Sequence, residues 1–444
     1  MRKYSIIYLL ALTAMACNNN NGNSNYSNAY NNSILYCKTV KELNNVVMGN
    51  NFPPIIASRN YAYASIAAYE CIVVGDSNYQ SLAGQIKHLK PFTPPDTANV
   101  NFQMAALLAF CKVGEAVTFP EGSMGDYVTN LKKMADSIHM PSKAIKATQT
   151  MADSVAAHII RWSKQDNYAQ LRSAPKYTVT QEEGRWVPTP PAYAQALEPH
   201  WREMRPMVMD SATQFIPPRP MPFNIKDKNS AYYKEVMSVK NAGDSLSDEQ
   251  KHIAEFWDDL NNKLQTSGHV MFVTKKFSPP GHWMNIVGIA AEKSKADFNT
   301  TVSAYALTSI AIFDAFIQCW DEKFRSNTVR PETVINKYID QDWRPYLQTP
   351  PFPEYTCGHS TVSSAAAEAL TEVFGDNFNY TDSSELEFGI KNRSFTSFRQ
   401  AADENNWARF YGGIHFHSSC LVSTKYGKKV GSWVTNKLHL RKKP

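Results

Sequence analysis

The sequence lacks several features that mark common protein classes. Its seven cysteines include no Cys-x-x-Cys pair, which argues against a zinc ribbon or a thioredoxin-type site. The formal net charge of +6 is spread along the 444 residues with no basic block beyond residues 441–443, so charge does not indicate nucleic-acid binding. Sustained strand-type alternation and repeats of fixed period are missing as well. What is left is an ordinary globular composition, and its patterning favours helices.

The first 17 residues have the pattern of an export signal. Arg2 and Lys3 precede an apolar stretch, residues 6–12, which is too short to span a bilayer. Cys17 follows small residues and lies where a bacterial lipoprotein carries its lipidated cysteine, although Ala14 stands in place of the usual leucine. We expect residues 1–17 to be a signal peptide and Cys17 to anchor the exported protein to a bacterial cell-envelope membrane. Periplasmic or secreted export without a lipid is the alternative.

The rest of the chain divides by composition. Residues 18–35 are rich in asparagine and predict a flexible tether. Apolar residues then recur at three- and four-residue spacing in two stretches, 36–172 and 233–444. Between these, residues 173–232 are crowded with prolines, which block long helices. The pattern predicts an all-α fold with an N-terminal helical domain (36–172), a proline-rich connector (173–232) and a second helical bundle (233–444).

Three short segments in the second half carry residues suited to binding an anion. Lys323 is followed after six residues by Arg330, and Arg409 is followed after five residues by His415. Tyr-Thr-Cys-Gly-His-Ser at 355–360 lies between them. The two arginines and the lysine are cations, and the planar fork of arginine matches a tetrahedral oxyanion.

The middle segment adds a helix start and an imidazole. Gly358 precedes an alanine-rich run and is expected to open a helix, where backbone N–H groups can approach an anion closely. His359 and His415 supply two imidazoles, of which one can act as ligand or nucleophile while the other moves protons. Each residue alone has a commonplace structural explanation, but the joint pattern predicts an oxyanion pocket.

The segments resemble the signature shared by vanadium-dependent haloperoxidases and type 2 phosphatidic acid phosphatases. That signature reads Lys-x6-Arg-Pro, then Pro-Ser-Gly-His, then Ser-Arg-x5-His. The resemblance extends to Trp-Val-Pro-Thr-Pro-Pro at 186–191 and Asp-Ala-Phe-Ile at 314–317, and it covers roughly residues 180–435. Pro-Pro-Phe-Pro-Glu-Tyr at 350–355 is similar to the haloperoxidase version, in the bacterial branch.

The resemblance implies vanadate as the cofactor, in a pocket that phosphate can also occupy. His415 is then the residue that bonds vanadium, or the phosphoryl-accepting nucleophile of a phosphatase. His359 is implied as the acid–base group, and Phe352 is implied to lie on the halide side of the pocket. The oxyanion or cofactor contacts implied by the family pattern are Lys323, Arg330, Cys357, Gly358, His359, Arg409 and His415.

Three positions depart from the family pattern. Cys357 replaces a serine whose hydroxyl would be a better hydrogen-bond donor than a thiol. Ala408 replaces the serine before the second arginine, and Ser419 replaces an aspartate that orients the terminal histidine. All three cations and both imidazoles are retained.

The resemblance therefore implies a haloperoxidase that oxidises a halide with hydrogen peroxide. A phosphomonoesterase that hydrolyses a phosphate ester through phospho-His415 is the alternative in another reaction class. The departures at Cys357, Ala408 and Ser419 motivate a third reading, a degenerate phosphate-binding lipoprotein without catalysis.

Overall fold

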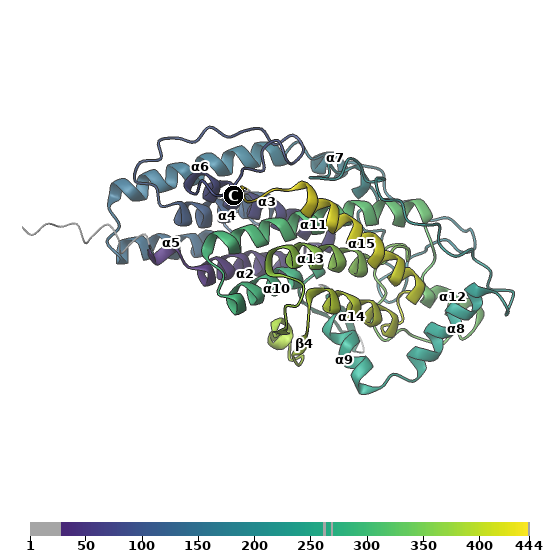
Figure 1. The fold of residues 1–444 in the computed structure, drawn as a ribbon. Coiled ribbons are helices and arrows are strands. Elements are labelled where there is room, and N and C mark those ends of the chain that lie inside the picture. The colour runs from purple at the N-terminus through teal and green to yellow at the C-terminus, as the bar shows by residue number, and fades with distance from the viewer. Residues whose placement is uncertain (1–27, 261–262, 268–269, 443–444) are drawn as a thin grey trace, which may run out of the picture.

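The computed structural model describes residues 28–260, 263–267, 270–442, and Figure 1 shows their arrangement. The expected signal peptide, Cys17 and most of the expected tether lie outside the described residues.

The described chain is mainly helical, which confirms the predicted all-α class. The helices of the first part are α2 (Ser33–Gly49), α3 (Pro54–Gly75), α4 (Phe102–Val117), α5 (Gly125–Ser137), α6 (Ser142–Ser163) and α7 (Tyr168–Leu171). Those of the second part are α8 (Ala231–Asp244), α9 (Asp248–Phe256), α10 (Pro279–Ser294), α11 (Phe298–Ser326), α12 (Pro331–Tyr338), α13 (Gly358–Phe374), α14 (Phe398–Tyr411) and α15 (His417–Lys437). In Figure 1, α5 and α6 lie at one end of the molecule and α8 and α12 at the other.

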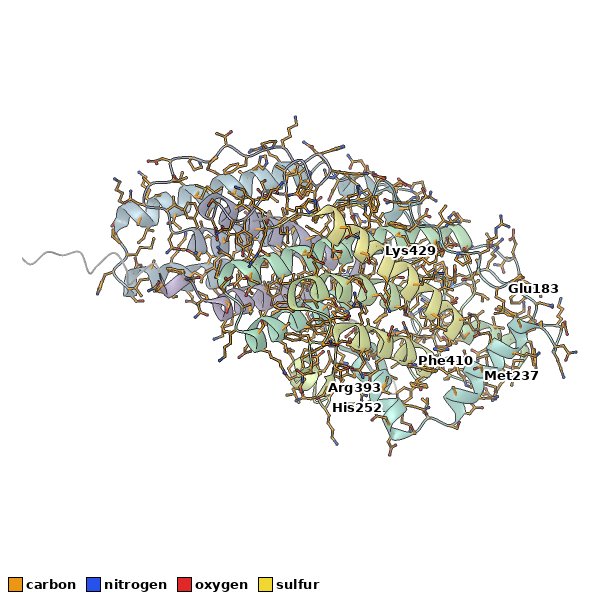
Figure 2. All side chains as sticks on the ribbon, in the orientation of Figure 1. Glu183, Met237, His252, Arg393, Phe410 and Lys429 are labelled. Atoms are coloured by element: carbon orange, nitrogen blue, oxygen red, sulfur yellow. The ribbon has the colours of Figure 1, made fainter. Side chains whose placement is uncertain are left out.

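Short elements complete the fold. They are the 3-10 helices η1 (Trp201–Glu203) and η2 (Ser384–Phe388) and two antiparallel hairpins, β1 (Lys263–Ser267) with β2 (Val270–Thr274) and β3 (Tyr380–Asp382) with β4 (Arg393–Phe395). Arg393 of β4 contacts His252 of α9 at 3.1 Å, and Figure 2 shows these side chains together. Arg393 also donates to Glu404 of α14 at 2.6 Å, so the β3–β4 hairpin is held against two helices.

The central helix α11 joins the two parts of the chain. It packs against α3, α10, α13 and α15, and its apolar stretch is long enough to cross a membrane but is entirely buried within the protein. The ring of Tyr36 in α2 meets those of Phe298 and Tyr305 in α11 at 5.6 and 5.5 Å. One hydrophobic cluster thus includes residues from both predicted bundles. The domain boundaries given above stay predictions.

Several local expectations differ from the structure. Within the stretch 233–444, expected to be a helical bundle, helix α9 ends at Phe256 and is followed by the β1–β2 hairpin. Residues 28–35, expected to be part of the tether, are largely helical, because Tyr30 is buried and its hydroxyl donates to the carbonyl of Leu131 at 2.7 Å. Burial of the Tyr30 ring in the core stabilises this segment by more than the neighbouring asparagines favour disorder.

The proline-rich connector is fastened to α11. Residues 173–230 contain the short 3-10 helix η1 and otherwise consist of turns, bends and extended chain. Asp314 of α11 is fully buried and accepts hydrogen bonds of 2.7–2.8 Å from the backbone N–H groups of Met207, Val208 and Met209. Burial raises the pKa of Asp314 to about 6, although these donors oppose the rise. Gln318 and Trp320 of α11 add hydrogen bonds of 3.1 Å to the carbonyls of Phe215 and Leu197, so several side chains of the central helix hold the connector.

Helices α13 and α15 pack at very short range. A Cβ atom on Gly427 of α15 would lie 2.2 Å from the carbonyl oxygen of Thr361 in α13, and one on Gly431 would lie 2.8 Å from that of Ala365. The glycines let the middle of α15 come close to the first half of α13, which begins at Gly358 of the middle segment.

Replacing Gly427 with alanine is expected to force these helices apart. Overpacking of this kind costs about 1–3 kcal/mol. We expect chemical denaturation to show a loss of that size in the unfolding free energy of Gly427→Ala. Gly49→Ala is the matched control, because a Cβ there meets nothing within 4 Å. Equal stability of the two variants would contradict the close packing.

Candidate active site

The residues predicted from the three motifs meet at one place. Lys323 lies near the end of α11, Arg330 is the N-cap of α12, and Arg409 lies in the last turn of α14. Gly358 opens α13, as expected, and His415 lies just before α15. All five are buried, and an Arg330 N–H group lies 2.9 Å from Nε2 of His415. Their individual roles stay predictions.

Uncharged carbonyl groups hold the cations in place. Lys323 Nζ donates to the carbonyls of Pro353 and Glu354 at 2.8 and 3.1 Å. Arg330 donates to the carbonyls of Phe352 and Ile414, and Arg409 to that of Trp257. Burial lowers the pKa of Lys323 to about 8 and that of Arg330 to about 10. Carbonyl partners fix the geometry without cancelling the positive charge, so the pocket retains a strong preference for an anion.

Several buried polar atoms still need a partner. Nη2 of Arg330, Nε of Arg409 and Nε2 of His359 have no hydrogen-bond partner among the described residues. The N-cap Cys357 makes no side-chain cap bond to the first turn of α13, whose N–H groups are thus left for a ligand. A Cβ on Gly358 would come no closer than 3.5 Å to Trp320, so packing does not demand glycine here. These features fit a bound tetrahedral or five-coordinate oxyanion such as vanadate or phosphate.

His415 is oriented by the carboxylate of Glu354, the residue just before the middle segment. Oε1 of Glu354 accepts from Nδ1 of His415 at 2.8 Å and from the backbone N–H of Phe416 at 3.3 Å. Because a carboxylate only accepts, Nδ1 carries the proton and Nε2 keeps its lone pair. The hydroxyl of Ser419 donates to Oε2 of Glu354 at 3.0 Å.

This arrangement explains the departure at Ser419. The family aspartate at that position is absent, but Glu354 supplies a carboxylate to the same imidazole and Ser419 anchors it. The sequence showed Glu354 within Pro-Pro-Phe-Pro-Glu-Tyr, yet nothing in the sequence linked it to a histidine 61 positions later. Ala408, the second departure, is buried in the main hydrophobic core.

His359 faces the cations as a neutral base. Burial, followed by the positive charge of Arg409, holds its pKa well below the ordinary value. Its Nε2 lies 3.9 Å from Oδ2 of Asp259, a residue with a left-handed backbone φ of 44°. An L-residue at such a φ is uncommon, and strained positions concentrate at functional sites.

Asp259 belongs to a buried ion network that the sequence did not predict. His282 bonds Asp259 at 2.9 Å and Asp382 at 3.0 Å through its two nitrogens. Burial opposes protonation, but the two carboxylates raise the pKa of His282 well above its ordinary value. Lys276 lies 3.0 Å from Glu385 in the same network. Asp259, His282 and Glu385 are close enough to hold a metal ion, but both ring nitrogens of His282 are already bonded to carboxylates and Lys276 already pairs with Glu385. In the sequence His282 stands between Gly281 and Trp283, and no pattern there links it to its carboxylate partners.

Cys357 occupies the place of the family serine in contact with His415. Its backbone N–H donates to the hydroxyl of Ser423 at 2.8 Å. Burial opposes ionisation, but hydrogen bonds to Cys420 and His415 hold the pKa of the Cys357 thiol well below its ordinary range. The six described cysteines, these two included, are free thiols.

A cavity of about 380 Å³ gives access to the site. Phe352 lines it, and its ring lies 4.9 Å from Nζ of Lys323 and 5.0 Å from the guanidinium of Arg330. The aromatic ring thereby shields two cations from water while leaving the cavity open. The other lining residues include His359, Arg409, Asp258, Asp259, and the connector residues Thr189, Pro190, Ala192, Ala194 and Leu197.

Glu354→Gln tests the orienting carboxylate. Losing the carboxylate should leave the His415 ring less firmly oriented and weaken its bond to vanadate, and loss of such a supporting partner typically costs about 10- to 100-fold in affinity. Calorimetric titration measures the change. Adding Ser419→Asp to this variant returns a carboxylate and should recover part of the affinity. Glu332→Gln is the control, because Glu332 is buried and bonds Thr349 rather than an imidazole. Equal affinity in all three would show that Glu354 does not position His415.

The comparisons with known proteins agree with this geometry. Residues 303–442 match a family model described as the VCPO second helical-bundle domain. No curated protein gave a match. Holo- and apo-type bacterial vanadium-dependent chloroperoxidase structures share the fold, with 16% and 17% identity, TM-scores of 0.67 and 0.65, and coverage of 87% of this chain and 93% and 94% of theirs.

A bacterial vanadium-dependent iodoperoxidase is much more similar. The structures align with a TM-score of 0.87 at 42% identity, over 93% of this chain and 98% of that one. With that identity over nearly all of both chains, and with three cations, two imidazoles and a helix start gathered in one buried pocket, this protein belongs to the vanadium-dependent haloperoxidase family.

Proposed function

We propose that this protein binds vanadate in the pocket and uses hydrogen peroxide to oxidise iodide. The observation that carries the proposal is the set of buried, carbonyl-fixed cations with unpaired N–H groups beside an oriented His415. The choice of iodide rests on the similarity to an iodoperoxidase over nearly the whole chain. When bound, vanadate supplies a Lewis-acidic centre at which peroxide becomes reactive toward halide.

The protein's own residues prepare this chemistry. Arg330, Arg409 and the first N–H groups of α13 would hold the oxygens of the oxyanion, and Nε2 of His415, which lies 2.9 Å from an Arg330 N–H group in the empty pocket, would be the protein ligand. His359, neutral before the anion binds, accepts a proton at Nε2 and returns it during turnover. Asp259 lies close enough to stabilise the imidazolium that forms.

The function is tested by a paired assay on the chain from residue 18 onward. One sample is loaded with vanadate and given hydrogen peroxide with iodide, bromide or chloride, and halogenation of a dye is recorded. We expect iodide oxidation that depends on vanadate and is abolished in His415→Ala. His417→Ala is the matched control, since His417 stacks on Trp407 at 4.1 Å and does not line the cavity, and it should retain activity.

The second sample separates the alternatives. It is kept free of vanadate and given an aryl phosphate. Phosphate release that vanadate inhibits, without halogenation in the first sample, would replace the haloperoxidase proposal with a phosphomonoesterase acting through His415. Silence in both samples with intact phosphate binding would indicate a non-catalytic binding protein. The position of Glu354 argues against a non-catalytic protein, because its carboxylate orients His415 in place of the aspartate that Ser419 replaces.

We also propose that the protein is exported and lipid-anchored through Cys17, on the pattern of residues 1–17. Expressed in a Gram-negative host with a labelled fatty acid, the wild-type chain should take up label and sediment with membranes. Cys17→Ala should lose both properties. An unlabelled wild-type protein found in the soluble periplasmic fraction would leave plain export as the correct description.

A further inference from the structure

The Asp259 carboxylate lies next to two groups of the oxyanion pocket, and all three residues line the same cavity. Oδ2 of Asp259 is 3.9 Å from Nε2 of His359, and both atoms lack a hydrogen-bond partner among the residues that the structure describes. Arg409 donates to the carbonyl of Asp258, the residue before Asp259, at 3.2 Å, and its Nε likewise has no partner there. Because a carboxylate and a guanidinium form a strong pair, Asp259 in contact with Arg409 would fill the anion site itself.

His282 binds the Asp259 carboxylate through its other oxygen. Nδ1 of His282 is 2.9 Å from Oδ1 of Asp259, and Nε2 of the same ring is 3.0 Å from Oδ2 of Asp382 in β3. Because a carboxylate only accepts hydrogen bonds, both ring nitrogens must donate, so the ring carries a positive charge. Hydrogen bonds between charged partners are stronger than neutral ones, and these two therefore hold Asp259 firmly.

The His282 ring is itself rigidly placed. His282 is fully buried in helix α10, and its ring stacks on that of Trp257 with 4.8 Å between the centroids and 26° between the planes. Asp382, its second partner, accepts hydrogen bonds of 3.0 and 2.6 Å from the backbone N–H and the hydroxyl of Ser384. Asp259, in contrast, lies in a segment without helix or strand. The fixed ring therefore sets the position of a side chain whose own backbone is irregular.

We propose that His282 is a positioning residue, which holds the Asp259 carboxylate beside His359 and away from Arg409. In this position the free oxygen of Asp259 can stabilise the imidazolium that forms when His359 accepts a proton, and Arg409 keeps its charge for the oxyanion. The positive charge of His282 also offsets that of Asp259, which lowers the repulsion between this carboxylate and a bound anion. The inference rests on the proposed function for the role of His359, whereas the holding of Asp259 does not depend on turnover.

Two substitutions of His282 separate its two hydrogen bonds. The side-chain nitrogen of asparagine takes the place of Nδ1, and that of glutamine takes the place of Nε2. His282→Asn therefore keeps a donor for Asp259, and His282→Gln keeps a donor for Asp382. Because both variants lose the positive charge, a difference between them reports which hydrogen bond supports the pocket.

The test is calorimetric titration of the mature chain with inorganic phosphate, in the absence of vanadate. We expect His282→Gln to bind phosphate at least about tenfold more weakly than His282→Asn, because partners that support a ligand contribute about 10- to 100-fold. Adding Asp259→Asn to His282→Gln should restore the affinity, since the carboxylate that competes for Arg409 has then been removed. His252→Gln is the matched control, because His252 lies in α9 and contacts Arg393 rather than Asp259, and it should bind phosphate like the wild type.

A spectrum of the wild-type protein tests the same hydrogen bond without a substitution that could prevent folding. In nuclear magnetic resonance with isotope-labelled histidine, we expect one imidazole with protons on both nitrogens. These protons should exchange slowly with water, because His282 is fully buried. The two signals should be absent in His282→Gln, which assigns them. A ring with one protonated nitrogen at this place would overturn the proposal, since it could not donate to both carboxylates.

Equal phosphate affinity of the two His282 variants would also overturn the proposal. The same holds if the double variant binds no better than His282→Gln, because damage that persists without the Asp259 carboxylate is general damage to the fold. Under the proposed function, kcat for iodide oxidation at saturating vanadate should follow the same order as the affinities, with KM for iodide unchanged. If the affinities follow this order but the wild type halogenates nothing, the proposed function fails and the positioning of Asp259 stands. If the wild type oxidises iodide and both variants match it in affinity and kcat, the positioning role fails and the proposed function stands.

Discussion

The site depends on keeping three cationic side chains in the interior without giving them anionic partners. Burying a cation costs several kcal/mol unless an opposite charge compensates it. Lys323, Arg330 and Arg409 are instead held by backbone carbonyls, which satisfy the hydrogen bonds but leave the charge. The remaining interactions of the fold must offset this cost in the empty protein, and a bound anion supplies the compensating negative charge. Stability is thereby linked to occupancy, since an anion that binds only the folded pocket stabilises it.

Carboxylates are present, but they bond imidazoles. Glu354 bonds His415, and Asp259 with Asp382 bonds His282 behind His359. Had these acids been placed against the arginines, they would have filled the anion site themselves. Setting each one beyond an imidazole lets it fix a ring and tune its protonation while the cations remain available. Both imidazoles of the site thus have a carboxylate nearby, at 2.8 Å for His415 and 3.9 Å for His359.

Much of this architecture was accessible from the sequence, and the reasons for the exceptions are physical. Helical periodicity predicted the class, and the three motifs predicted the cations, both imidazoles and the helix start at Gly358. Glu354 and the Asp259–His282–Asp382 chain were missed because their bonds join residues 61, 23 and 100 positions apart, and no periodic pattern encodes such pairs. Tyr30 was placed in a tether because its neighbours are polar, whereas the partner that buries it, Leu131, lies 101 residues further on.

The connector has a consequence for how new specificities arise. It contributes the cavity wall at residues 189–197, is pinned to α11 by Asp314 and is tied to the middle motif by the Leu197 N–H bonded to the carbonyl of Pro351. Its segment has little regular secondary structure, so its side chains can vary without disturbing a helix. The groups that hold the oxyanion lie on or at the ends of the rigid helices of the core. Substitutions in the connector can therefore change the cavity through which halide and organic acceptor enter without altering the residues of the pocket. Relatives with a common pocket can in this way differ in what they halogenate.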